Sequence, residues 1–102
     1  MAQFDVFKNP GGGPYTLLVD IQSDVLAQLP TRVVVPLTSL KRYGGRPITK
    51  LNPVVTIGGT QYVMVFQDLA AVPHKVLGER VDSLERRRDE LVAAIDLLFT
   101  GI

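Results

Sequence analysis

Few side chains in this sequence have the chemistry of a catalyst. His74 is the only histidine and cysteine is absent, so neither a thiolate metal site nor a cysteine nucleophile can form. A metal site would need carboxylates alone, and none of these cluster at ligand spacing. No Gly-x-Ser-x-Gly elbow surrounds Ser23, Ser39 or Ser83, which disfavours a hydrolase triad. We therefore expect His74 on the surface, no metal and no cofactor.

The glycine triplet Gly11-Gly12-Gly13 has the composition of a phosphate-binding loop but not its context. No Lys-Ser or Lys-Thr pair follows it, and no helix is predicted directly after it. Pro10 and Pro14 flank the triplet, and proline removes a backbone donor that a strand would need. The pattern predicts a loop or hairpin connection.

Charge is distributed unevenly along the chain, although its sum is small. The net charge of +1 excludes the strong positive field of a protein that coats nucleic acid. Between Asp24 and Asp68 there is no acidic residue. The same stretch holds five cations, of which the last four lie in a predicted exposed loop: Arg32, Lys41, Arg42, Arg46 and Lys50. They are either ordinary solvated charges or a basic surface for an acidic peptide or a phosphodiester backbone.

A second group of cations, Arg86-Arg87-Arg88, lies in the predicted C-terminal helix. Glu85 and Arg88 are three residues apart, and Arg86 and Glu90 are four apart, which is the spacing of neighbours on a helix surface. Each such pair stabilises a helix by about 0.2–0.5 kcal/mol. We therefore predict a solvated helix face whose charges pair with one another.

The length of 102 residues fits one domain, 1–102, and leaves no room for a second core. A composition of 46% hydrophobic and 21% charged residues excludes a disordered chain. No apolar run approaches the roughly 20 residues of a membrane span, and residues 1–7 lack the layout of a signal peptide. Together with the absence of cysteine, these features predict a cytoplasmic protein with no membrane contact.

The first three-quarters of the chain favour strands, because valine, isoleucine, threonine and tyrosine are frequent there. The Gly58-Gly59 pair supplies the positive φ angles of a tight turn and predicts a hairpin of residues 53–57 and 60–66. Pro73 restricts the following segment to a short or edge strand. The predicted strands are residues 3–8, 15–21, 32–37 (buried on both faces), 53–57, 60–66 and 75–77.

The end of the chain has the pattern of a helix. Residues 82–99 contain neither glycine nor proline, and Asp82 with Glu85 fits a capping box. The leucines and isoleucine at positions 84, 91, 95 and 98 fall on one helical face, and Gly101 ends the helix. The outline is an antiparallel sheet or small barrel capped by one C-terminal helix.

The last residues are more apolar than a fraying terminus should be. Leu97 and Leu98 cannot both face one core, because adjacent helical positions point about 100° apart. Leu97 or Phe99 therefore points out of the domain. Two interpretations stay open at this point: a homodimer seam or binding tip, and a terminus docked back on its own sheet.

The sequence resembles the CcdB family of toxins from Gln3 to Ile102, with differences in the loops. The match is specific because the run Val19-Asp20-Ile21-Gln22-Ser23-Asp24 occurs together with the ending Phe99-Thr100-Gly101-Ile102. The matching stretches are Val19-Asp20-Ile21-Gln22-Ser23-Asp24-Val25-Leu26, Arg32-Val33-Val34-Val35-Pro36-Leu37, Pro53-Val54-Val55 with Ile57-Gly58, Val72-Pro73, Val76-Leu77-Gly78-Glu79, and Ile95-Asp96-Leu97-Leu98-Phe99-Thr100-Gly101-Ile102.

This resemblance implies an SH3-like antiparallel barrel with one C-terminal helix, of the architecture shared by CcdB and MazF toxins, that forms a homodimer. It also implies a toxin that is not itself an enzyme but binds the gyrase A subunit and traps the cleaved DNA–gyrase complex. By analogy, the gyrase-binding residues are Val25, Leu26, Asp96, Phe99, Thr100, Gly101 and Ile102.

The resemblance further implies an antitoxin of the CcdA type, with a DNA-binding N-terminal part and an acidic, disordered C-terminal part. The toxin would meet DNA only indirectly, through the transcription-regulating complex with this antitoxin. An acidic segment that folds on contact needs a fixed positive surface. The basic loop is therefore the predicted antitoxin-binding site, with the residues Lys41, Arg42, Arg46 and Lys50.

One position departs from the family pattern. Well-known members have tryptophan where this chain has Thr100, and threonine offers no ring face to a gyrase arginine. Two alternatives stand beside gyrase poisoning. The resemblance extends to MazF toxins, which share this barrel and cut RNA, and it allows a MazF-like endoribonuclease that uses Arg32, Arg46 and Thr49. Thr100 favours the other alternative, an antitoxin-binding module that has lost gyrase poisoning.

Overall fold

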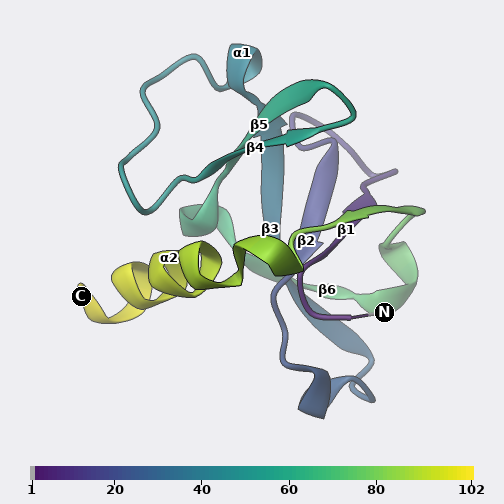
Figure 1. Cartoon of the computed structure of the whole chain (residues 1–102). Helices are drawn as coiled ribbons and strands as arrows, with labels where there is room; N and C mark the ends of the chain where they lie inside the picture. The colour runs from purple at the N-terminus through teal and green to yellow at the C-terminus, as the bar shows by residue number, and fades with distance from the viewer. Residues whose placement is uncertain (1) are drawn as a thin grey trace.

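An antiparallel sheet of seven strands forms the body of the computed structural model, which describes residues 2–102. The strands lie in the order β4-β5-β3-β2-β1-β7, and β6 pairs with β3 beside this path. The sheet curls into a half-barrel (Figure 1). The strands are β1 (Asp5–Lys8), β2 (Leu17–Asp20), β3 (Thr31–Ser39), β4 (Val54–Ile57), β5 (Thr60–Met64), β6 (Ala70–Pro73) and β7 (Arg80–Ser83).

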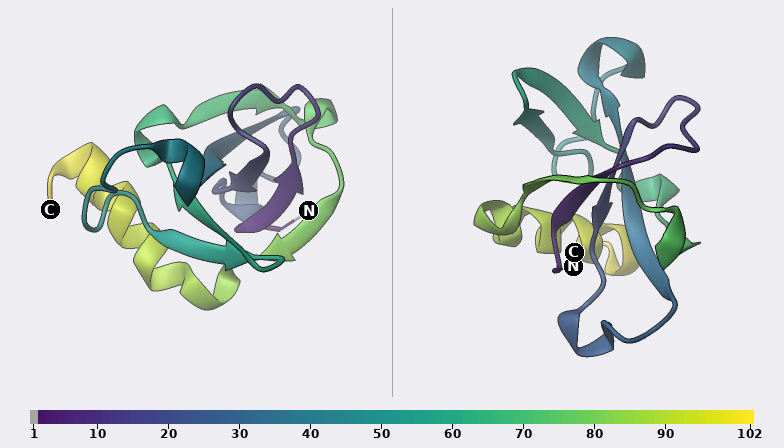
Figure 2. Two further views of the ribbon diagram at one scale, coloured as in Figure 1. Left: turned by 90° about the horizontal axis from the view of Figure 1, so that it is seen from above. Right: turned by 90° about the vertical axis from the view of Figure 1, so that its right-hand side faces the viewer.

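Short helical turns connect the strands, and α2 (Arg88–Thr100) ends the chain (Figure 2). The predicted outline, mostly antiparallel β with one C-terminal helix, is confirmed. Among the described residues, no helix combines the length and the apolar character needed to cross a membrane. The short helices are η1 (Asp24–Leu26), α1 (Leu40–Tyr43), η2 (Phe66–Asp68), η3 (His74–Val76) and η4 (Glu85–Arg87).

The nine-residue strand β3 organises the sheet. It pairs with β2 along one edge, while its other edge pairs first with β6 and then with β5. Because two strands share that edge, the sheet forks there. The stretch 32–37 is buried apart from the half-buried Val33, which confirms the prediction of a strand covered on both faces.

Two local predictions from glycine are also confirmed. Gly58 and Gly59 have φ angles of 57° and 82°, and they join β4 to β5 in the predicted hairpin. Gly101 has a φ of 75° and ends α2 in the left-handed conformation that residues with a Cβ rarely adopt.

The core lies between the curled sheet and the last part of the chain. Leu91 and Ala94 of α2 are completely buried, and Ile95 and Leu98 pack against the same cluster, so the predicted helical face is the one that docks. The buried cluster consists of Phe4, Val6, Leu17, Val19, Val35, Leu37, Val55, Ile57, Met64, Phe66, Leu84, Leu91 and Ala94.

The predicted strand at residues 75–77 is wrong. The chain forms the 3₁₀ turn η3 at His74–Val76, and the strand precedes it as β6, Ala70–Pro73. β6 supplies the partner that the first half of β3 needs, with Thr31 opposite Pro73 and Val34 opposite Ala70. Proline can stand at the end of a strand but cannot donate to a ladder, so the strand ends at Pro73 instead of following it.

The predicted start of the C-terminal helix at Asp82 is also wrong. Asp82 belongs to β7, which pairs with β1, and α2 begins only at Arg88 after the turn η4. The hydroxyl of Ser83 accepts a hydrogen bond from the backbone N–H of Glu85 at 3.3 Å, but the cap residues of η4 and α2 are Leu84 and Arg87, and neither makes a side-chain cap hydrogen bond. Pairing of β7 with β1 overrides the local capping signal, because it gives the backbone N–H and C=O groups on that edge of β1 their hydrogen-bond partners.

Candidate functional site

Residues 23–30, between β2 and β3, project from the sheet as an exposed segment that we name the η1 tip (Figure 1, blue). The hydroxyl of Ser23 accepts a hydrogen bond from the backbone N–H of Val25 at 3.2 Å and starts the turn η1. Val25 is 89% exposed and Leu26 is 48% exposed. Leu29 is 47% exposed and belongs to the same tip, although it was not predicted as a binding residue. Its spacing of three residues from Leu26 was the feature of the sequence that could have indicated it.

The last seven residues, 96–102, form a second projection that we name the C-terminal tip. Phe99 is 67% exposed and Ile102 is 91% exposed, so the terminus is not docked back on its own sheet. Leu97 is half-buried, so Phe99 and not Leu97 is the exposed apolar side chain of that predicted pair. Exposed apolar side chains of this size in a small domain indicate a contact surface.

The polar residues of the C-terminal tip are exposed as well. The hydroxyl of Thr100 donates a hydrogen bond to the backbone carbonyl of Asp96 at 2.7 Å, so it is used within the helix. The backbone N–H of Gly101 donates to the carbonyl of Leu97 at 3.1 Å and closes the last turn. These two bonds fix the direction in which the tip leaves the domain.

The basic loop consists of residues 41–50, which begin on α1 and continue toward β4. All four predicted cations are exposed: Lys41, Arg42, Arg46 and Lys50. Within residues 2–102, none of these side chains forms an ion pair or a hydrogen bond. Their charge is therefore free to meet a partner.

A buried amide that the sequence reasoning missed shapes the basic loop. Asn52 is 3% exposed, and its Oδ1 accepts a hydrogen bond from the backbone N–H of Ile48 at 3.0 Å. Its Nδ2 donates to the carbonyl of Met64 at 3.1 Å and to Oε1 of Gln67 at 2.8 Å. Asn52 therefore ties the loop to the end of β5, and the Asn52-Pro53 pair before a strand was the only available signal.

Arg32 does not belong to the exposed basic surface. It is 1% exposed, and its guanidinium contacts the buried carboxylate of Asp20, with Nε to Oδ2 at 2.8 Å and Nη2 to Oδ2 at 2.6 Å. Desolvation raises the pKa of Asp20, and the backbone N–H of Gln22 and the Arg32 guanidinium oppose that shift. Because it lies inside the fold, Arg32 cannot contact an RNA phosphate, which removes one residue of the proposed ribonuclease site.

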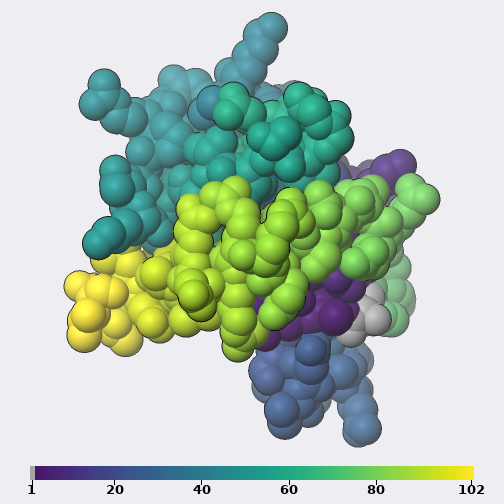
Figure 3. All heavy atoms as spheres, in the orientation of Figure 1, coloured from purple at the N-terminus to yellow at the C-terminus, as the bar shows by residue number. Residues whose placement is uncertain are grey.

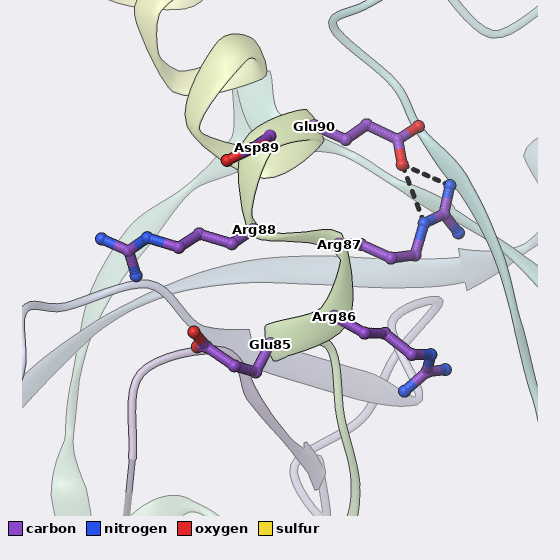
Figure 4. Close-up of a pocket in the computed structure, with 6 residues that line it drawn as sticks. All are labelled: Glu85, Arg86, Arg87, Arg88, Asp89 and Glu90. Atoms are coloured by element: carbon purple, nitrogen blue, oxygen red, sulfur yellow. Dashed lines mark hydrogen bonds and ion pairs between the residues drawn. The ribbon is translucent and has the colours of Figure 1, made fainter.

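The arginine triplet, residues 86–88, is used inside the protomer, but not through the predicted pairs. Arg86 contacts Asp82 at 3.6 Å and donates to the carbonyl of Ser83, and Arg87 contacts Glu90 at 2.5 Å. The three side chains leave the backbone in different directions around the start of α2 (Figure 4). The predicted pairs Glu85–Arg88 and Arg86–Glu90 do not form.

Further contacts connect the triplet with β4 and with the N-terminal turn before β1. Arg87 Nη1 donates to the carbonyl of Val54 on β4 at 2.9 Å. Arg88 Nη1 donates to Oε1 of Gln3 at 3.0 Å, and its guanidinium carbon lies 5.4 Å from the centre of the Phe4 ring. The triplet therefore anchors the start of α2 and does not present a free basic patch.

The position of His74 agrees with the sequence prediction. His74 is exposed on η3, as predicted. In the part of the chain that the structure describes, no three histidine or carboxylate side chains are grouped so that they could hold a metal ion.

The candidate surfaces lie on different parts of one protomer. The η1 tip projects at the bottom of the molecule in Figures 1 and 3, whereas the C-terminal tip lies at the left. The basic loop lies on the same side as the C-terminal tip in these views and in the view from above in Figure 2. A single protomer therefore does not unite the two groups of predicted gyrase-binding residues.

Comparison with protein-family models gives a match over almost the whole chain. The model of the CcdB protein family matches residues 3–101. CcdB proteins are toxins of toxin–antitoxin systems that poison DNA gyrase, and they are not enzymes themselves. The curled antiparallel sheet and the single C-terminal helix agree with this match. With its matched sequence and this fold, the chain belongs to the CcdB family.

Proposed function

We propose that this single-domain chain, 1–102, is a toxin that binds the gyrase A subunit in the cytoplasm and holds the cleaved DNA–gyrase complex open. The observation that carries the proposal is the exposure of Val25, Phe99 and Ile102, at positions that the family resemblance assigns to gyrase. Leu26 on the η1 tip and Asp96 on the C-terminal tip are exposed as well. The toxin acts by binding to gyrase and not by catalysis. Burial of these large apolar side chains would supply the main part of its affinity.

The active form in this proposal is a homodimer. The η1 tip and the C-terminal tip are separate in one protomer, and a symmetric pair presents both kinds of tip to a target that is itself dimeric. Sedimentation at micromolar concentration tests this point, and a monomer there would contradict it.

Thr100 sets the expected strength of the toxin. Its hydroxyl is bonded to the Asp96 carbonyl, and it has no ring to place over a cation. A cation–π contact contributes about 0.5–2 kcal/mol, so this chain binds gyrase more weakly than one with tryptophan. We expect Thr100→Trp to tighten binding to gyrase A, whereas Thr100→Val, which keeps the shape, leaves it nearly unchanged.

The basic loop is the proposed site for a CcdA-like antitoxin with an acidic, disordered tail. Its four cations have no partner within residues 2–102, and Asn52 anchors the loop backbone at Ile48 to the end of β5. A fixed positive surface lowers the ordering cost of the incoming segment and accelerates its encounter at low salt. This complex would bring the toxin to DNA through the antitoxin, where it would regulate transcription.

A cleavage assay tests the proposed function. Purified toxin is mixed with gyrase, supercoiled DNA and ATP, and linear DNA is measured after protein denaturation. The proposal predicts double-strand breaks that increase with toxin and are lost with Phe99→Ser. A lack of breaks at saturating wild-type toxin, together with binding to the antitoxin, would instead support a module that has lost gyrase poisoning.

A further inference from the structure

The η1 tip has no core of its own. All residues from Ser23 to Thr31 are exposed, so no buried side chain within the segment holds its conformation. A loop without buried apolar contacts should open readily unless hydrogen bonds from outside fix it. The structure supplies such bonds from residues at its base, and the most buried of them is Gln22.

Gln22 is 7% exposed and uses both ends of its side-chain amide. Its Oε1 accepts a hydrogen bond from the backbone N–H of Val33 on β3 at 3.0 Å. Its Nε2 donates to the backbone carbonyl of Leu26 at 3.0 Å. The orientation of the amide is fixed by these partners, because one is a donor and the other is an acceptor. A single side chain therefore joins the turn η1 to the central strand of the sheet.

The backbone of Gln22 is held by the buried ion pair. Oδ1 of Asp20 accepts a hydrogen bond from the backbone N–H of Gln22 at 2.9 Å, while Oδ2 contacts Arg32. Both partners of the ion pair are buried, which fixes the position of the carboxylate. Gln22 therefore starts from an anchored backbone, and its amide transmits that position to Leu26.

Gln3 connects the base of the η1 tip with α2 through three hydrogen bonds. The backbone N–H of Gln3 donates to Oδ1 of Asp24 at 2.8 Å, and its Nε2 donates to the carbonyl of Ile21 at 3.0 Å. Its Oε1 accepts from Arg88 at the start of α2. Gln3 thus lies between the base of the η1 tip and the helix that carries the C-terminal tip.

We propose that Gln22 is a positioning residue, which holds the exposed Val25, Leu26 and Leu29 in the conformation that the target recognises. This inference rests on the proposed function, because it assigns the η1 tip to the gyrase-binding surface. Gln22 contacts no partner itself. A tip that is ordered before binding avoids the loss of conformational freedom that a mobile loop suffers at an interface.

Hydrogen exchange tests the clamp without any partner. Gln22→Met keeps the length of the side chain but removes both amide contacts. We expect the amides of Leu26, Ala27 and Leu29 to exchange about tenfold faster, which corresponds to about 1.4 kcal/mol, while the amides of α2 keep their wild-type rates. Gln61→Met is the matched control, since Gln61 is exposed and its side chain makes no hydrogen bond within residues 2–102. Unchanged exchange in the η1 tip of Gln22→Met would overturn the proposal.

Binding to gyrase A supplies the second readout. Gln22→Met should weaken binding by about tenfold, at unchanged dimer content and with Gln61→Met at the wild-type affinity. A faster-exchanging tip with wild-type affinity would overturn the positioning role. Failure of the wild-type protein to bind gyrase would refute the proposed function instead, and the exchange result would still decide whether Gln22 fixes the tip.

A second variant guards against a folding defect in Gln22→Met. Gln22→Asn keeps a polar amide but is one carbon shorter, so it cannot contact Val33 and Leu26 together. If Gln22→Met does not fold, faster exchange confined to the η1 tip of Gln22→Asn supports the clamp, and wild-type exchange there overturns it.

Discussion

The arginine triplet and the basic loop carry similar charge in the sequence, but the fold uses them differently. Each arginine of residues 86–88 has partners within the protomer, including backbone carbonyls of β4 and β7. The four cations of residues 41–50 have no such partner within residues 2–102. A row of cations therefore indicates a binding surface only when the fold does not already use its charge.

Arg32 extends this comparison to the interior, since it lies in the same acid-free stretch as the basic loop but is buried against Asp20. The three groups differ in what their loss removes. Arg32 supplies the opposite charge in contact with the buried carboxylate of Asp20, the triplet supplies surface anchors, and the basic loop supplies charge for a partner. Stability should therefore decrease most for Arg32 and least for the basic loop.

The largest effect is expected for Arg32→Gln. Removing one partner of a buried ion pair leaves the other charge uncompensated and costs about 3–5 kcal/mol in the free energy of unfolding. Urea unfolding at pH 7 measures this loss. The double variant Asp20→Asn with Arg32→Gln should recover part of it, because no buried charge remains, and a double variant less stable than Arg32→Gln would contradict the account.

The same variant should show a defined pH dependence. Burial raises the pKa of Asp20 in the folded protein, so its contribution to stability is complete below the unfolded pKa and is lost as the pH rises through the folded pKa. Without Arg32, the pKa of Asp20 in the folded protein rises further. The buried carboxyl group therefore stays neutral, and keeps its contribution to stability, up to a higher pH. The deficit of Arg32→Gln should therefore shrink as the pH falls from 7 toward 5. If the stability deficit of Arg32→Gln grew as the pH fell, that result would contradict the raised pKa of Asp20.

An intermediate effect is expected for Arg87→Ala. This variant loses the hydrogen bond to the Val54 carbonyl and the partly exposed ion pair with Glu90. Together these contacts contribute about 1–2 kcal/mol, with the exposed pair at the low end because solvent screens it. Thermal unfolding measures the loss. Binding of the antitoxin should keep its wild-type affinity, and a weaker complex would extend the antitoxin site to the triplet.

The smallest effect on stability is expected in the basic loop. Combining Lys41→Glu, Arg42→Glu and Arg46→Glu should change the free energy of unfolding by no more than about 0.5 kcal/mol per site, because these side chains make no contact to lose. Antitoxin binding should weaken at least tenfold and lose most of its salt dependence. Lys75→Glu is the matched control for the single variant Lys41→Glu, because both lysines are exposed and without an ion pair within residues 2–102. Equal weakening by the control would indicate a general effect of net charge.

Features controlled by local chemistry were predictable from the sequence. Gly58-Gly59 and Gly101 require positive φ angles, and both the hairpin and the end of α2 follow from them. The helical face with Leu91 follows from a period of 3.6 residues. The resemblance supplied the apolar positions of the two tips, which the structure exposes.

Features controlled by distant partners were not predictable. Asp82 has the local pattern of a cap, but β1 takes it into a strand. Gln22 and Asn52 look like ordinary polar residues, and only the folded chain shows that each holds an exposed segment through two or three hydrogen bonds. Arg32 was predicted in a buried strand and also considered for a ribonuclease site, because the sequence did not show that Asp20 pairs with it.

Binding of the purified toxin to the gyrase A subunit tests the central claim most directly. Calorimetric titration of wild-type toxin, Phe99→Ser and Val25→Ser should show that each serine variant, with unchanged melting temperature, weakens binding by at least tenfold, the loss of about 1.4 kcal/mol expected for a buried apolar contact. Wild-type affinity in both variants would show that the exposed tips are not the surface that contacts gyrase.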